Sequence, residues 1–139
     1  MRILLLPVLC LLSFQLLNAQ VKTYGHSAKT SHVLQQLNEQ WKSDSLGLLG
    51  YRFKHFEALS KSKPDSISTD QLMKYLGRPN IIRKSTYGNP RRDHVEYVYF
   101  ILNDDPGGKL PSFGGLYLSF VFDAEENYLE EISEGEFCG

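Results

Sequence analysis

The spacing of apolar residues is helical in the first half of the chain. Two amphipathic helices are predicted, over residues 31–43 and 51–61, because apolar side chains recur at intervals that place them on one helical face. These side chains are Leu34, Leu37 and Trp41 in the first segment, and Phe53, Phe56 and Leu59 in the second. Polar residues occupy the opposite face of each segment, so both helices are expected to pack on one side.

The strongest local signal marks a third helix, over residues 69–76. Ser68 is followed three residues later by Gln71, which is the spacing of a capping box at a helix N-terminus. Gly77 stands where a helix end favours a left-handed residue, and Pro79 blocks any continuation. Both ends of this helix are therefore predicted from sequence.

The apolar period changes from helical to alternating at residue 81. Four strands are predicted, at 81–87, 94–102, 116–122 and 128–133, with a loop over 103–115 and a turn over 123–127. The strand 94–102 is apolar on both faces, which indicates a central strand. Helices followed by strands favour an α+β fold, with two or three N-terminal helices on one face of a three- to four-stranded antiparallel meander.

The first residues have the three-part layout of a secretory signal peptide, residues 1–19. A positive charge at Arg2 precedes the apolar run Ile3–Leu17, and the small residue Ala19 follows. The run is too short, and too interrupted by polar residues, to span a bilayer as a helix. We expect cleavage after Ala19 and export to the periplasm or secretion, with no membrane span. Cys10 lies within the apolar run rather than at its end, so we expect the processed chain to be unlipidated.

The remaining chain is expected to form one domain. Residues 20–30 are small and polar and are interpreted as a flexible leader, which leaves 31–139 as the folded unit. Arg2 leaves with the signal peptide, so 14 Lys and Arg side chains face 16 Asp and Glu, a net charge of −2. A nearly neutral domain lacks the field that draws basic proteins to nucleic acid. Cys138, the one remaining cysteine, is expected to be a free thiol or an intermolecular bridge.

No arrangement of residues in the sequence predicts catalysis, a metal site or a cofactor. The histidines lack the i, i+4 spacing of a helical zinc site and have no cysteine beside them; they are His26, His32, His55 and His94. The adjacent carboxylates fall in turns or on opposite faces of a strand, which does not create the raised pKa of a general acid; they are Asp104 and Asp105, Glu125 and Glu126, and Glu130 and Glu131. We expect no small-molecule ligand.

Charge is segregated along the chain. Residues 71–92 carry six basic and no acidic side chains, whereas 123–139 carry seven acidic and no basic ones. One interpretation is two solvated surfaces that attract each other across neighbouring strands. The other is a basic lip that meets an acidic partner, with nearby tyrosines on the exposed face of the sheet. The candidate interface consists of Arg83, Lys84, Tyr87, Arg91, Arg92, Tyr97, Tyr99 and Tyr117. The structural alternative is that these tyrosines cover the core.

The order of motifs over residues 67–133 resembles the SmpA/OmlA family of small outer-membrane proteins. A capped helix ending in Leu76–Pro79 precedes the strand Val95–Tyr99, and the strand Leu118–Asp123 precedes a turn. The family includes BamE-like proteins, and its fold is shared with β-lactamase-inhibitor-like domains. The known members are lipoproteins with an acylated N-terminal cysteine, which we do not expect in this chain, so their role in outer-membrane assembly is not carried over.

Three functions follow as hypotheses. The resemblance and the absence of catalytic constellations favour a non-catalytic envelope interaction or scaffolding module with a protein partner. The analogy with inhibitor domains suggests an inhibitor or immunity-like protein that binds an enzyme. An enzyme of unrecognised type is the third hypothesis, because a fold does not exclude a function.

Overall fold

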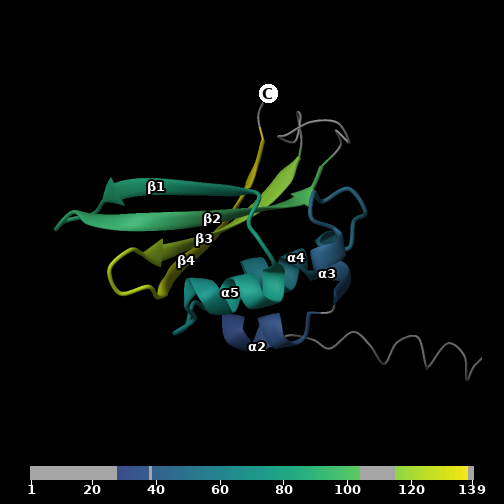
Figure 1. The fold of residues 1–139 in the computed structure, drawn as a ribbon, viewed down its shortest axis with the longest axis horizontal. Helices are drawn as coiled ribbons and strands as arrows, with labels where there is room; N and C mark the ends of the chain where they lie inside the picture. Colours follow the sequence, from purple (N-terminus) through teal and green to yellow (C-terminus); the bar gives the residue numbers. More distant parts are fainter. Residues whose placement is uncertain (1–27, 38, 104–114, 138–139) are drawn as a thin grey trace, which may run out of the picture.

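In the part of the chain that the structure describes, four short helices precede a four-stranded sheet (Figure 1). The computed structural model describes residues 28–37, 39–103 and 115–137. The helices are α2 (Thr30–Gln35), α3 (Glu39–Ser43), α4 (Phe53–Ser60) and α5 (Thr69–Leu76). The strands are β1 (Ile81–Tyr87), β2 (Arg92–Leu102), β3 (Leu116–Asp123) and β4 (Leu129–Glu136). The predicted α+β class is confirmed.

The sheet is an antiparallel meander in the order β1-β2-β3-β4. Each strand pairs with the next one in sequence, as the short connections predicted. β1 has the predicted limits, β2 begins two residues before the predicted start, and β4 extends to Glu136. β1 and β4 are the two edges of the sheet, so two strands lie between the basic edge strand and the acidic one.

The predicted helix over 31–43 is two helices instead of one. α2 ends in a tight turn, in which the N–H of Gln36 donates to the carbonyl oxygen of Val33 at 3.0 Å. α3 then presents Trp41, which is fully buried. Leu34 and Trp41 both reach the core as expected, but from separate helices.

The capping of α5 agrees with the sequence pattern. The Ser68 hydroxyl accepts from the Gln71 N–H at 3.3 Å, and the Gln71 side chain accepts from the Ser68 N–H at 3.0 Å. Gly77 ends the helix at φ 78° and ψ −164°. Its φ is positive as predicted, but its ψ is extended rather than left-handed helical, a region that is essentially restricted to glycine.

One hydrophobic cluster joins the helices to the sheet, and Figure 1 shows the helices together below the strands. The helical half contributes Val33, Leu34, Trp41, Leu59, Ile67, Leu72 and Leu76. The strands contribute Tyr99, Ile101, Leu118, Phe120, Phe122 and Leu129. We call the side of the sheet that carries these residues the helix side, and the opposite side the outer face.

β2 is buried on both faces, as its composition predicted. Tyr99 lies in the cluster on the helix side, while Val98 and Phe100 are buried on the outer face. The Phe100 ring meets the Phe137 ring edge-on, with their centroids 5.3 Å apart. β2 is also a central strand, paired with β1 along one edge and with β3 along the other.

The fold begins before residue 31, so the predicted leader is too long. Lys29 forms a bridge with Lys63, and the Lys63 N–H donates to the carbonyl oxygen of Ala28 at 2.9 Å. Thr30 is fully buried, and its hydroxyl bonds to Ser62. Several predictions fall outside the described residues: the expected signal peptide at 1–19, residues 20–27 of the expected leader, most of the 103–115 loop, and Cys138.

Candidate protein-binding surface

The β1–β2 hairpin carries the predicted basic lip. β1 pairs with β2 over seven consecutive residue pairs, from Ile81 opposite Val98 to Tyr87 opposite Arg92. Every β1 residue after Ile81 is exposed. In Figure 1 the turn end of this hairpin extends past the helices. The sheet therefore presents an edge strand that is solvated on both faces.

Four cations occupy this hairpin: Arg83, Lys84, Arg91 and Arg92, all of them exposed. We call them the basic hairpin cluster. Arg83 lies 3.6 Å from the Glu96 carboxylate, and Arg92 lies 3.8 Å from that of Asp123. The cation of each pair is about half exposed, and both separations are longer than a hydrogen bond, so these pairs contribute little stability. Lys84 and Arg91 pair with no carboxylate of the described residues, so the cluster keeps charge available for another molecule.

The aromatic ring of Tyr87 is fixed against a buried histidine. It stacks on His94 with centroids 3.8 Å apart, and the His94 Nε2 lies 2.9 Å from the Glu130 carboxylate. The other Glu130 oxygen accepts from the Tyr128 hydroxyl at 2.9 Å, and this hydrogen bond raises the pKa of Tyr128. Burial, aided by Glu131 and Glu130, raises the pKa of Tyr87. Tyr87 is thus an ordered and partly exposed aromatic surface, 44% accessible.

Asp123 fixes the turn that follows β3. One carboxylate oxygen accepts from the N–H groups of Glu126 and Glu125, both at 2.8 Å. These bonds lower the pKa of Asp123, the one from Glu126 most, and Arg92 and His94 lower it further. The Asp123 side chain thus closes the turn predicted over 123–127. It also gives Arg92 a fixed anionic neighbour.

The predicted attraction between the basic and acidic segments across neighbouring strands occurs at one ion pair, between Arg92 on β2 and Asp123 at the end of β3. β1 and β4 are opposite edges of the sheet, so their side chains do not face each other across one strand pair. Arg83 on β1 instead lies beside Glu96 on β2, which belongs to neither charged segment. Glu130 extends from β4 only as far as His94 on β2.

The tyrosines do not form one exposed face with the basic residues. Tyr99 is fully buried on the helix side, which corrects its assignment to the interface; its hydroxyl donates to the Gly77 carbonyl oxygen at 3.0 Å. Burial raises its pKa far above the ordinary value. Tyr97 is half-buried against Phe122, with ring centroids 5.7 Å apart. The strand pairing places the rings of Tyr97 and Tyr99 on the helix side, where they cover the core.

Tyr117 is also separated from the basic hairpin cluster. It is half-buried and lies opposite Phe100 near the other end of the sheet. Its ring centroid is 4.9 Å from that of Phe137, and its hydroxyl lies close to Gly135. Of the four predicted tyrosines, Tyr87 alone is exposed beside the four cations.

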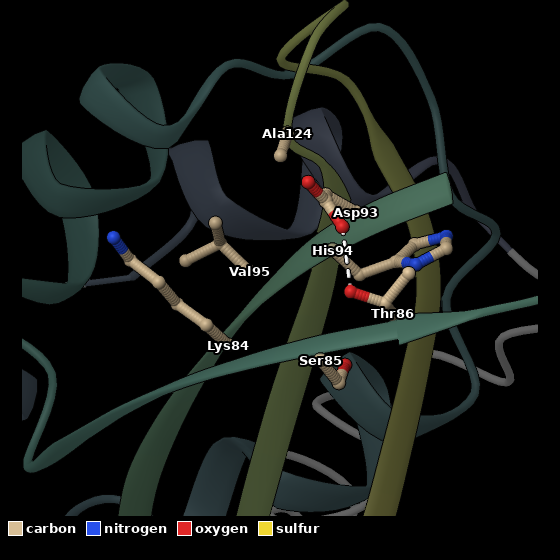
Figure 2. A pocket seen from close by; sticks show the side chains of 7 residues that line it. All are labelled: Lys84, Ser85, Thr86, Asp93, His94, Val95 and Ala124. Atoms are coloured by element: carbon tan, nitrogen blue, oxygen red, sulfur yellow. Dashed lines mark hydrogen bonds between the residues drawn. The ribbon is translucent and has the colours of Figure 1, made fainter. Parts of the chain in front are cut away.

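A shallow hollow lies beside the hairpin. It is lined by Lys84, Ser85, Thr86, Asp93, His94, Val95 and Ala124 (Figure 2). The Thr86 hydroxyl donates to the Asp93 carboxylate at 2.6 Å, whereas Lys84 extends next to Val95, its partner in the strand pairing. The hollow therefore combines one engaged carboxylate with one uncompensated cation.

A buried polar network lies under the loop between α3 and α4, and sequence reasoning missed it. The Arg52 side chain is buried; its guanidinium donates to the Phe100 carbonyl oxygen at 2.9 Å and to the Asn80 side chain at 3.0 Å. It also lies 5.2 Å from the centroid of the Trp41 ring. Burial lowers the pKa of Arg52 to about 10, against the opposing effect of Asp44. Asp44 accepts from the N–H groups of Leu49 and Arg52.

This network supports an exposed apolar loop. Leu49 is 61% accessible and Phe53 51%, and Leu46 and Leu48 are exposed as well. The loop is tied to the sheet, because the Asn103 N–H donates to the Gly47 carbonyl oxygen at 2.9 Å. The available sequence signal was the run Leu46–Leu49, in which three leucines lie between the two predicted helices and outside both.

Within residues 28–37, 39–103 and 115–137, no helix is long and apolar enough to cross a membrane. The same part of the chain holds no group of three or more His, Cys, Asp or Glu side chains that could bind a metal ion. Comparison with protein-family models, with curated proteins and with solved structures finds no match to this chain.

Proposed function

We propose that this protein is an exported, non-catalytic interaction module of the cell envelope that binds a protein partner through its basic hairpin cluster. One observation carries the proposal. Arg83, Lys84, Arg91 and Arg92 are all exposed on a hairpin that extends past the helices. Lys84 and Arg91 have no carboxylate partner among the described residues, which leaves charge to attract an acidic surface.

The composition of this surface favours a protein partner. Arginine and tyrosine are enriched in protein interfaces, and Tyr87 provides a partly exposed ring held in place by His94. The chain as a whole is close to neutral, so the positive charge is local to the hairpin and does not extend over the whole domain. Export is the part of the proposal that rests on the expected signal peptide, residues 1–19.

The test is affinity capture from an envelope extract of the source organism. The bait is the processed chain, compared with a double variant, Lys84→Glu with Arg91→Glu. These two positions are chosen because their reversal breaks no ion pair among the described residues. The matched control is Lys74→Glu with Arg78→Glu, which changes the net charge equally at exposed positions in and just after α5.

The proposal expects a specific protein to be retained by the wild type and the control. It expects the hairpin variant to lose that protein, and the retained amount to fall as salt is raised. Retention of the same proteins by all three baits, or loss from both variants alike, would contradict a role for the hairpin.

A further inference from the structure

We propose that the free edge of β1 accepts an acidic, extended segment of another protein as a fifth strand of the sheet. The inference rests on the proposed function and specifies how the partner binds. An exposed edge strand offers a row of unpaired N–H and C=O groups, to which a peptide adds through main-chain hydrogen bonds.

The backbone of β1 is a regular template. Its seven pairs with β2 run without an irregularity, whereas the β2–β3 and β3–β4 pairings each contain a register shift. Among the described residues, β1 has no strand partner other than β2. Its side chains from Ile82 to Tyr87 are exposed, so no described segment covers this edge.

The side chains of β1 define the chemistry of the added strand. Adjacent residues of a strand point to opposite faces, so Arg83 lies on the outer face and Lys84 on the helix side. A partner strand that neutralises both needs two adjacent carboxylates. Ile82, 56% accessible, and Tyr87 provide apolar contacts near the two ends of the strand.

The same charges disfavour a second copy of β1 as the occupant. Pairing of two β1 edges brings like charges at Arg83 and Lys84 close together, which destabilises cross-strand pairs. The glutamates of β4 from another copy are the competing occupant. Glu130 is already engaged by His94 and Tyr128, and the register shift between Val121 and Phe122 interrupts the pairing of β4 with β3. These observations favour a segment of another protein.

The probe for this proposal is a fluorescein-labelled peptide, Thr-Val-Glu-Asp-Val-Thr, with blocked ends. Fluorescence anisotropy measures its binding to the processed chain. A second peptide has the same side chains but N-methylated amides at alternate residues, which removes strand hydrogen bonding and keeps the charge. A third carries Lys in place of Glu and Asp.

We expect saturable binding of the acidic peptide, and at least tenfold weaker binding of both other peptides. Arg83→Glu with Lys84→Glu should weaken binding of the acidic peptide at least tenfold. The control pair Lys74→Glu with Arg78→Glu should leave it unchanged. Circular dichroism of each variant checks that the fold is retained.

Three outcomes overturn the proposal. Equal binding of the N-methylated peptide means a charge contact without strand addition. No binding of any peptide means that the edge is not a docking site. Self-association of the wild type in sedimentation, abolished by the β1 variant, means that a second copy is the occupant. The first outcome leaves the proposed function standing, because the envelope capture tests charge alone.

Discussion

The Arg52 guanidinium and the Phe100 carbonyl oxygen, 48 residues apart, are joined by a hydrogen bond of 2.9 Å. This bond connects the start of α4 to the central strand β2, beneath the apolar loop. The Asn80 side chain takes part as well, since its oxygen accepts from Arg52 and from the Phe100 N–H at 2.8 Å. The helical half and the sheet are thus tied through one buried cation.

Replacing Arg52 by methionine should destabilise the protein strongly. The methionine retains an apolar stem but leaves the buried Phe100 carbonyl oxygen without the guanidinium donor, and it removes one of the two donors to the Asn80 oxygen. We expect the free energy of unfolding to fall by about 2–4 kcal/mol, measured by urea denaturation. The control is Lys54→Met, at an exposed position, with an expected change below about 0.5 kcal/mol. Equal midpoints for the two variants would contradict the role of the network.

Gly47 and Gly50 form a matched pair for separating backbone strain from steric contact. Both have positive φ, 70° and 73°. A Cβ at Gly47 would lie 3.0 Å from backbone atoms of Phe100 and Ile101, whereas nothing lies within 4 Å of one at Gly50. We expect Gly47→Ala to lose about 1–3 kcal/mol more than Gly50→Ala, because overpacking adds to the shared strain. Thermal unfolding measures the stability lost by each variant. Similar losses for the two variants would mean that the loop moves to accommodate the new Cβ at Gly47 without losing stability.

Replacing Gly77 should lower the stability of the fold through backbone strain alone. Its φ of 78° is unfavourable for any other residue, yet a Cβ there would meet only the Lys42 side chain, at 3.9 Å. We expect Gly77→Val to lower stability by about 1–2 kcal/mol, with Gly77→Ala close to it, because the first side-chain carbon already creates the strain. A normal melting temperature for the alanine variant would show that the chain adopts another turn.

We expect the Asp123 carboxylate to contribute to a loss of folding stability in acid. Its pKa is lowered in the folded state by the N–H groups of Glu126 and Glu125 and by Arg92. The carboxylate therefore stabilises the fold above its ordinary pKa of 3.8, and this contribution is lost as the pH falls through the lower folded value. Asp123→Asn should be less stable at pH 7 but lose less between pH 5 and 2. Thermal midpoints across that range test the slope, with the exposed Glu125→Gln as control.

Processing predicts a defined N-terminus. If residues 1–19 are a signal peptide, the exported protein begins at Gln20 and lacks the mass of the preceding segment. Intact mass spectrometry of protein purified from its native host decides this. A mass that includes residues 1–19 would contradict the expected cleavage and, with it, the proposed location.

Local signals explain the parts of the fold that sequence predicted well. The limits of α5 and β1 follow from residues within a few positions, such as the Ser68 cap and the Pro79 stop. The division of the first helix was missed because Leu34 and Trp41 fit one continuous apolar stripe. Two short helices can place the same two residues in the core, so the apolar spacing does not distinguish one helix from two.

Long-range contacts explain the parts that sequence did not predict. Alternation along β2 separates Tyr99 from Phe100, but it does not say which face meets the helices. Tyr99 was therefore assigned to the surface although it is buried. The position of Arg52 depends on acceptors on Asn80 and Phe100, far along the chain, and nothing near Arg52 in sequence reveals them. The basic hairpin cluster was predictable because its residues are close in sequence.

The strand order places positive side chains at one edge of the sheet and negative side chains at the other. One edge strand carries Arg83 and Lys84, and the opposite edge carries Glu131 and Glu134. The net charge of the chain is small, but the separation of charged side chains gives the molecule a dipole moment. This dipole comes from side chains rather than from backbone peptides. In the field of an acidic surface such a molecule turns its β1 edge forward before contact, so salt should slow the association rate more than the net charge alone implies.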